Sequence, residues 1–157
     1  MQKTAQSVLN ILRAKGWKLA TAESCTGGMI SSALVEIAGS SDVFDRGFVT
    51  YSNQAKIDML GVSTRTLRAH GAVSTETAAE MATGALQNAK TDIAVSVTGV
   101  AGPGASATKP EGRVCFGLAQ KGKDVKTFQM DFGTLGRTNV RQESAQFALN
   151  MILDATK

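Results

Sequence analysis

The stretch Ile93-Ala94-Val95-Ser96-Val97 decides the fold class of this chain of 157 residues. It is a nearly continuous apolar run of strand length, and such runs are typical of strands that are covered on both faces in a parallel or mixed sheet. It leads directly into the glycine-rich turn Thr98-Gly99-Val100-Ala101-Gly102-Pro103-Gly104. The run therefore predicts a central strand that ends in a flexible loop.

Segments on both sides of this strand alternate between strand and helix patterns. Further strands are expected at residues 17–22, 44–52, 112–120 and 125–130, and the turn at 121–124 joins the last two as a hairpin. Apolar residues at helical spacing, with caps and glycine stops, predict helices at 2–15, 27–37, 53–60, 64–69, 74–88 and 136–155. Helices that flank central strands predict a single α/β domain over residues 1–157, a three-layer α/β/α arrangement around a mixed sheet.

Composition narrows the classes of partner. The net charge is +4, but the basic residues are scattered singly among few aromatic residues, so no nucleic-acid surface is predicted and an anionic small molecule is equally compatible. Cys25 and Cys115 show no metal-ligand or disulfide spacing, which predicts reduced thiols and no metal site. No apolar run has the length of a signal peptide or a membrane span, so we expect a cytoplasmic protein that does not contact a membrane.

Three polar segments follow predicted strands: Thr21-Ala22-Glu23-Ser24-Cys25-Thr26-Gly27-Gly28, Thr50-Tyr51-Ser52-Asn53-Gln54-Ala55-Lys56, and the turn 98–104. Loops positioned by a rigid sheet are where binding and catalysis concentrate. Glycines in the last turn, among them Gly99 and Gly102, let the backbone approach a phosphate or a ring closely. We therefore expect the three segments to meet in one site.

The hydroxyl of Ser24 is a candidate nucleophile, although Ser24 or Thr26 can equally cap the following helix. The only histidine, His70, precedes a glycine stop and is expected to be a helix-end residue, so a Ser-His-Asp triad is not predicted. Glu23 and Lys56 remain as candidate bases.

A lysine acts as a base only when it is neutral, which requires desolvation or a neighbouring cation. Lys56 lies among apolar residues, but a solvated lysine on an amphipathic helix has the same pattern, and the residues alone favour that solvated state. Cys25 is expected to be a small buried residue rather than a thiol nucleophile. Arg137 and Arg141 share a helix face and could clamp a phosphate, or else lie in solvent or pair with Asp131 or Glu143.

Taken together, four segments in order resemble the family of the CinA C-terminal domain and its stand-alone relatives, the bacterial nicotinamide-nucleotide amidases. These segments are Thr21–Gly28, Gly47–Asn53 with Ala55-Lys56, His70–Ser74, and Thr98–Pro103. The resemblance extends over nearly the whole chain. It implies hydrolysis of the carboxamide of nicotinamide mononucleotide to nicotinic acid mononucleotide and ammonia, without a metal or other cofactor, in pyridine nucleotide recycling.

The resemblance also implies roles for single residues. Ser24 matches the nucleophile and Lys56 the base of a Ser/Lys serine amidohydrolase, Tyr51 matches an active-site tyrosine, and Thr98 with Arg137 or Arg141 matches supporting or substrate-binding groups. Backbone N–H groups of Cys25, Thr26, Gly27 and Gly28 are then expected to stabilise the oxyanion. Arg137, Arg141 or Lys109 is expected to hold the phosphate, and Tyr51 or Phe48 to face the pyridinium ring.

Two features depart from the family. We expect the chain to lack the molybdopterin-binding-like domain that the larger CinA proteins place before this one. Residues 104–110 stand where the family has a loop that is richer in glycine and acidic residues, which leaves substrate preference open. The alternatives are a non-enzymatic nucleotide-binding or competence-related partner module, suggested by the family's competence-damage inducible association, and an amidase for another small amide. A homo-oligomer is expected, and Ala-rich helices such as 74–88 can pack across a symmetric interface as readily as against the sheet.

Overall fold

The computed structural model of the chain describes residues 1–157 and has a five-stranded sheet at its centre. In the order β2-β1-β3-β4-β5, β1 pairs in parallel with both β2 and β3, whereas β4 pairs antiparallel with β3 and β5. The mixed sheet and the hairpin are confirmed. The strands are β1 (Leu19–Glu23), β2 (Phe44–Val49), β3 (Ile93–Gly99), β4 (Arg113–Gln120) and β5 (Lys126–Asp131).

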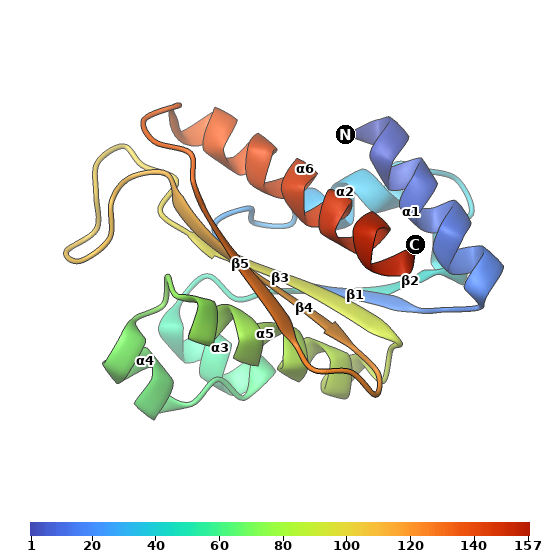
Figure 1. Ribbon diagram of the computed structural model, residues 1–157, viewed down its shortest axis with the longest axis horizontal. Coiled ribbons are helices and arrows are strands. Elements are labelled where there is room, and N and C mark those ends of the chain that lie inside the picture. The colour runs from blue at the N-terminus through green and yellow to red at the C-terminus, as the bar shows by residue number, and fades with distance from the viewer.

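Helices cover both faces of this sheet, which confirms the α/β/α layering (Figure 1). One face carries α1 (Gln2–Lys15), α2 (Met29–Val35) and α6 (Arg137–Thr156), and the other carries α3 (Asn53–Leu60), α4 (Thr64–His70) and α5 (Thr75–Ala89). None of the helices combines the length and the apolar character that a membrane crossing requires.

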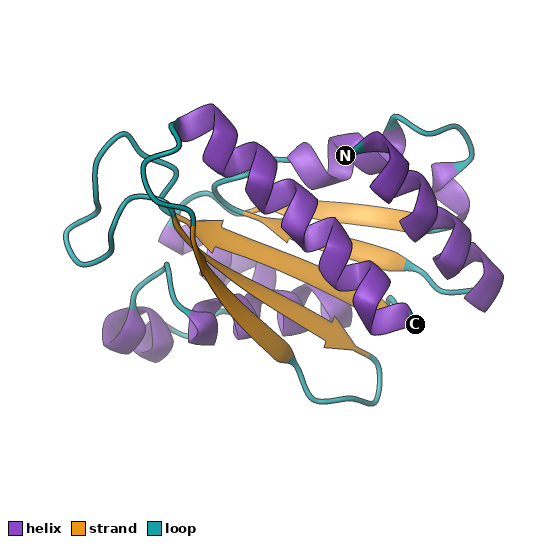
Figure 2. Cartoon of the chain, turned by 45° about the horizontal axis from the view of Figure 1, so that its top comes forward, coloured by secondary structure: helices purple, strands orange, loops and turns teal.

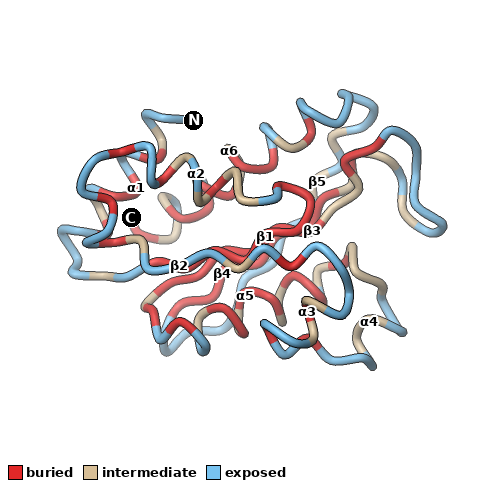
Figure 3. Tube along the Cα trace, turned by 180° about the vertical axis from the view of Figure 1, so that it is seen from behind, coloured by how far each residue is buried: buried red, intermediate tan, exposed pale blue.

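The apolar core lies in two layers, one on each side of the sheet. A cluster of 23 buried residues joins the sheet to α1, α2 and α6, and a cluster of eight joins it to α3 and α5. The three inner strands β1, β3 and β4 are buried along nearly their whole length, whereas the edge strands β2 and β5 are largely exposed (Figure 3). Every residue of Ile93–Val97 is buried. The apolar run that predicted a covered central strand is therefore correctly placed.

Element boundaries shift where glycine or capping chemistry takes over from the apolar pattern. The helix expected from Gly27 begins at Met29, because Gly27 and Gly28 adopt φ of 58° and 100°, outside the helical region. The strand expected to reach Ser52 ends at Val49, because Ser52 instead caps α3 by accepting a hydrogen bond from the Ala55 N–H at 3.0 Å.

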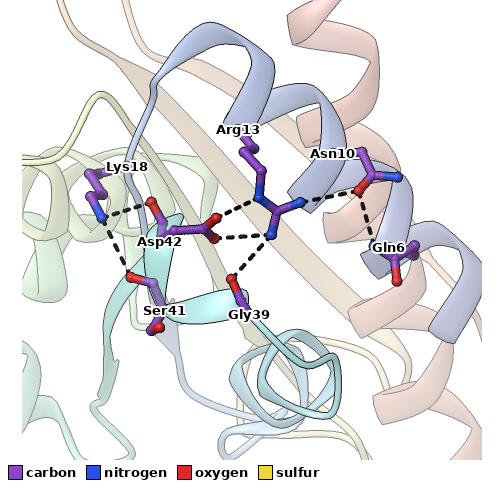
Figure 4. A network of polar contacts seen from close by, with 7 residues as sticks. All are labelled: Gln6, Asn10, Arg13, Lys18, Gly39, Ser41 and Asp42. Carbon is purple, nitrogen blue, oxygen red and sulfur yellow. Dashed lines mark hydrogen bonds and ion pairs between the residues drawn. The ribbon is translucent and has the colours of Figure 1, made fainter.

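At one end of the sheet, a polar network joins the end of α1 to the turn that precedes β2 (Figure 4). The Arg13 guanidinium, in the last turn of α1, donates to the Asp42 carboxylate at 2.5 and 3.0 Å and to the Gly39 carbonyl at 3.1 Å. Lys18 Nζ donates to the Asp42 carbonyl at 2.7 Å. These contacts hold the 3₁₀ turn Ser40–Asp42 where the chain enters β2. The loops at the other end project beyond the sheet, as Figure 2 shows for the segment between β3 and β4.

Candidate active site

A pocket of about 220 Å³ opens where β1 and β3 end and where the chain passes from β2 to α3. All three polar segments that the sequence singled out contribute to its wall, and the first turn of α6 closes one side. The lining residues are Ser24, Cys25, Tyr51, Lys56, Ala72, Val73, Thr98, Gly99, Ala101 and Arg137. A larger hollow between α1 and α2 is lined by Met1, Gln2, Met29, Ser32, Ala33 and Glu36, and in it no hydrogen bond joins the Ser32 hydroxyl to the Glu36 carboxylate.

Ser24 and Lys56 meet inside this pocket. Ser24 follows β1 directly, and its N–H donates to the Val97 carbonyl at 3.0 Å, which extends the parallel ladder by one residue. Lys56 lies in the first turn of α3, and its Nζ is 3.0 Å from Ser24 Oγ. The same Nζ lies 2.8 Å from the Thr50 carbonyl and 3.4 Å from the Tyr51 carbonyl.

Burial changes the protonation chemistry of this lysine. Lys56 is 1% exposed, and desolvation lowers the pKa of its ammonium from 10.5 to about 8, against a smaller opposing effect of Cys25. The expectation of a solvated surface lysine is therefore wrong. The helical pattern of α3 is that of a surface helix, but the Thr50–Tyr51 segment folds over its first turn and encloses the side chain.

Neither the Cys25 thiol nor the Glu23 carboxylate is available to react with or activate a substrate beside Ser24. Burial raises the pKa of the Cys25 thiol to about 12, so the thiolate is not available near neutral pH, and the residue is buried as expected. The Glu23 carboxylate is fully buried and accepts four hydrogen bonds, from Ser31 Oγ and from the N–H groups of Gly28, Ile30 and Ser31. Of the two candidate bases, only Lys56 therefore points at Ser24 Oγ.

Tyr51 and Arg137 lie together at the mouth of the pocket. The Tyr51 side chain lies on the surface, and the Tyr51 hydroxyl accepts a hydrogen bond from Arg137 Nη2 at 3.1 Å. Arg137 Nη1 also donates to the Gly102 carbonyl at 2.8 Å. At the pocket wall, Thr98 Oγ1 donates to the Ala72 carbonyl at 2.8 Å.

Arg137 and Arg141 do not both face the pocket, so they are not placed to clamp a phosphate as a pair, as their helical spacing had suggested. Arg141 lies outside the pocket wall and donates from Nε to the Cys25 carbonyl at 2.9 Å and from Nη2 to the Thr26 carbonyl at 3.1 Å. Neither arginine pairs with Asp131 or Glu143, and Asp131 is paired with Arg113 instead.

Three other candidates lie away from the pocket wall. Phe48 packs against the apolar cluster beneath α3 and α5. Lys109 is half-buried in the long loop, where its N–H bonds to Ser106. His70 ends α4 as expected, with Nδ1 3.7 Å from a Glu76 carboxylate oxygen.

Backbone N–H groups beside Ser24 are unequally available. The N–H of Gly27 donates to the Ser24 carbonyl at 3.1 Å, and the N–H of Gly28 donates to Glu23 at 3.0 Å. The N–H groups of Cys25 and Thr26 donate no hydrogen bond within the chain. Of the four N–H groups expected to stabilise an oxyanion, only those of Cys25 and Thr26 are therefore free to bind one.

Three residues of the pocket wall were not among the individual residues predicted from the sequence to form the site. Ala72, Val73 and Ala101 complete it, and only backbone turns at the ends of α4 and β3 bring them there. Ala72 and Val73 belong to one of the family-like segments, which is the signal that could have found them. No group of three or more His, Cys, Asp or Glu side chains is placed to hold a metal ion.

Fold and site together define an α/β/α protein that carries a buried serine–lysine pair at the carboxyl ends of its parallel strands. The chain belongs to the CinA C-terminal domain family, whose model matches residues 1–156. It is 54% identical over 143 residues to a nicotinamide-nucleotide amidohydrolase PncC of Enterobacter agglomerans, a match that covers 90% of this chain and 87% of that protein.

Other relatives are longer. A CinA-like protein of Syntrophobacter fumaroxidans is 52% identical over 143 residues, but this chain spans only 33% of its length. Among solved structures, the competence/damage inducible protein CihA of Agrobacterium tumefaciens superposes with a TM-score of 0.96 at 47% identity, covering 99% of this chain and 95% of that one.

Proposed function

We propose that this chain hydrolyses the carboxamide of nicotinamide mononucleotide, with Ser24 as nucleophile and Lys56 as base. The observation that carries the proposal is the buried contact of 3.0 Å between Lys56 Nζ and Ser24 Oγ. The PncC relative, which matches over most of both chains, supports the substrate. The lowered pKa of Lys56, about 8, supports its role, because a sizeable share of the lysine is neutral near pH 8.

The carbonyl groups around Lys56 orient the neutral amine. A neutral amine has two N–H donors and one lone pair. The Thr50 and Tyr51 carbonyls, at 2.8 and 3.4 Å, accept the two N–H bonds, so the lone pair is left for the Ser24 hydroxyl. The same two carbonyls stabilise the ammonium once it forms. The two carbonyls thus aid proton transfer from Ser24 to Lys56 in two ways: they orient the lone pair before the transfer, and they stabilise the ammonium after it.

Acylation follows from this arrangement. Lys56 Nζ takes the proton of Ser24 as Oγ forms a bond to the carboxamide carbon, and the oxyanion faces the N–H groups of Cys25 and Thr26. The carbon–nitrogen bond then breaks, and the Lys56 ammonium gives its proton to the leaving nitrogen. Ammonia departs, Lys56 is neutral again, and Ser24 carries the acyl group.

Deacylation repeats the proton transfers with water. Lys56 takes a proton from a water molecule whose oxygen attacks the acyl carbon, and it returns that proton to Ser24 Oγ as the ester bond breaks. The product is the carboxylic acid, which loses its proton at neutral pH. The pyridinium charge of the substrate also disfavours the ammonium form of Lys56, so a larger share of the lysine is neutral when the substrate is bound.

Arg137 is the group we assign to the phosphate. It lines the pocket and also the adjoining groove of residues 99–106, and it takes part in none of the ion pairs of the structure. Its fork is held by two neutral acceptors, the Tyr51 hydroxyl and the Gly102 carbonyl, which a phosphate can replace. The exposed Tyr51 ring beside it then faces the pyridinium.

The test is ammonia release from nicotinamide mononucleotide by the purified chain and by its Ser24→Ala and Lys56→Ala variants, each checked for an unchanged melting temperature. We expect turnover in the parent and losses of at least about 10³-fold in both variants. Binding of the nucleotide without turnover in the parent would favour a binding module instead. Turnover of a different small amide would reassign the substrate and leave the Ser–Lys pair in place.

A further inference from the structure

We propose that Arg141 is a positioning residue that sets the direction of the oxyanion-stabilising N–H groups in the nucleophile loop, residues 24–28, and that it does not bind the phosphate. This inference rests on the proposed function, because it names how the same site holds its geometry. The phosphate is left to Arg137, four residues earlier on the same helix.

The planarity of the peptide units in the nucleophile loop links the direction of each carbonyl to that of the next N–H. In a trans peptide the carbonyl of one residue and the N–H of the next point in opposite directions. Arg141 Nε holds the Cys25 carbonyl at 2.9 Å, so the Thr26 N–H must point away from the guanidinium. The Ser24 carbonyl is held by the Gly27 N–H at 3.1 Å, which fixes the direction of the Cys25 N–H in the same way.

Arg141 also holds the following peptide. Its Nη2 donates to the Thr26 carbonyl at 3.1 Å, and the Met29 N–H donates to the same oxygen at 3.2 Å. Two consecutive carbonyls of the loop are thus held by one planar fork. A lysine ammonium is a point charge on a flexible stem and does not supply this fixed geometry.

The loop is held at its other end by Glu23. This buried carboxylate accepts the Gly28 N–H at 3.0 Å and the N–H groups of Ile30 and Ser31 at the start of α2. Glu23, which directly precedes Ser24, is therefore hydrogen-bonded to Gly28, the last residue of the loop. With N–H groups held by Glu23 and carbonyls held by Arg141, the loop has little freedom to rotate its peptides.

Nothing else in the structure engages the Arg141 guanidinium. It takes part in no ion pair, and its only hydrogen bonds are those to the two loop carbonyls. The guanidinium lies directly against Gly27, where a Cβ would be at contact distance, 3.4 Å from Arg141 Nη2. The backbone of Gly27 has φ of +58°, a conformation that favours glycine.

Steady-state kinetics of Arg141→Lys and Arg137→Lys on nicotinamide mononucleotide separate the two roles. We expect Arg141→Lys to lower kcat by about 10- to 100-fold with KM within about threefold of the parent, because misdirected donors stabilise the transition state less. Arg137→Lys is the matched control and should instead raise KM by at least about tenfold, with kcat nearly unchanged. A rise in KM with unchanged kcat in Arg141→Lys, or no change in either constant, overturns the proposal.

Amide hydrogen exchange provides a readout that does not depend on turnover. Arg141→Lys should speed exchange at residues 27–29 by about tenfold or more, whereas Arg137→Lys should leave it at the parent rate. Equal protection in the parent and in Arg141→Lys contradicts the proposal even if the nucleotide is not the substrate. If Arg141→Lys does not fold, Arg141→Gln, which keeps donors for only one carbonyl, replaces it.

Discussion

At the scale of single residues, the chemistry of the site depends on the burial of one amine. Lys56 is 1% exposed and has no carboxylate within ion-pair distance. Two carbonyl groups accept hydrogen bonds from Lys56 Nζ, but no opposite charge offsets the desolvation of an ammonium there, so the pKa of Lys56 is lowered. This lowered pKa is what the proposed role of Lys56 as a base requires.

The pH dependence of turnover should report this amine. With a pKa of about 8, Lys56 is mostly protonated below that pH, so kcat/KM should fall by about tenfold for each pH unit below 8 and level off above it. Initial rates from pH 6 to 9.5 measure this profile. A profile that is flat between pH 6 and 8 would argue that Lys56 is not the base.

Stability should depend on pH through the same group. Below pH 8 the lysine is protonated in both the folded and the unfolded chain, and the folded chain carries the full cost of burial. Between about 8 and 10.5 the unfolded chain keeps a proton that the folded chain has lost, so the free energy of unfolding rises with pH.

Relative to Lys56→Met, the parent should therefore gain on the order of 2 kcal/mol between pH 7.5 and 9.5. Urea unfolding of both proteins at several pH values measures the difference. A constant difference across this range would mean that burial does not depress the pKa of Lys56.

Cys25 should be dispensable as a thiol. Its pKa of about 12 leaves almost no thiolate at pH 8, so alkylation by iodoacetamide should be slow in the folded chain and fast in urea. Cys25→Ala should retain turnover within about tenfold, because the backbone N–H and not the thiol serves the reaction. Loss of turnover comparable to that of Ser24→Ala would implicate the thiol.

At the scale of elements, the site exists because β1 and β3 run in parallel and end together. Parallel pairing places Ser24, the residue after β1, beside the end of β3. The hydrogen bond of 3.0 Å from the Ser24 N–H to the Val97 carbonyl results from this pairing. Periodicity and glycine position predicted this meeting of segments. They did not predict how α3 turns Lys56 inward, which depends on the path of the chain after β2.

The placement of α3 depends on a close approach to α5. Gly84 is buried in α5, and a Cβ at this position would lie 1.9 Å from the Leu60 carbonyl oxygen at the end of α3. Alanine normally favours a helix by about 1 kcal/mol over glycine, but here it forces α3 away from α5.

We expect Gly84→Ala to lower the free energy of unfolding by about 2–3 kcal/mol and to reduce kcat by moving Lys56. Gln87→Ala, at an exposed position of the same helix, should change neither. Thermal melts and initial rates of both variants decide the matter. A stable, fully active Gly84→Ala chain would show that α3 tolerates displacement.

At the scale of the whole molecule, most of the architecture could be predicted from local patterns. The buried run at Ile93–Val97, the hairpin and the helix caps each left a sequence signature, and the three layers follow from them. The placement of Lys56 beside Ser24 and of Arg141 beside the nucleophile loop could not be predicted in this way. Both depend on contacts between residues far apart in sequence, such as Arg141 with the Cys25 carbonyl, which no local pattern records.

In the proposed reaction Ser24 carries the acyl group during turnover. The most direct test of this step is intact-mass and peptide mapping of the chain after acid quench within milliseconds of mixing with nicotinamide mononucleotide. We expect a transient adduct of the substrate minus ammonia on Ser24, and we expect no adduct in Ser24→Ala or Lys56→Ala. Turnover without any adduct, persisting in Ser24→Ala, or an adduct on Cys25 instead, would contradict it.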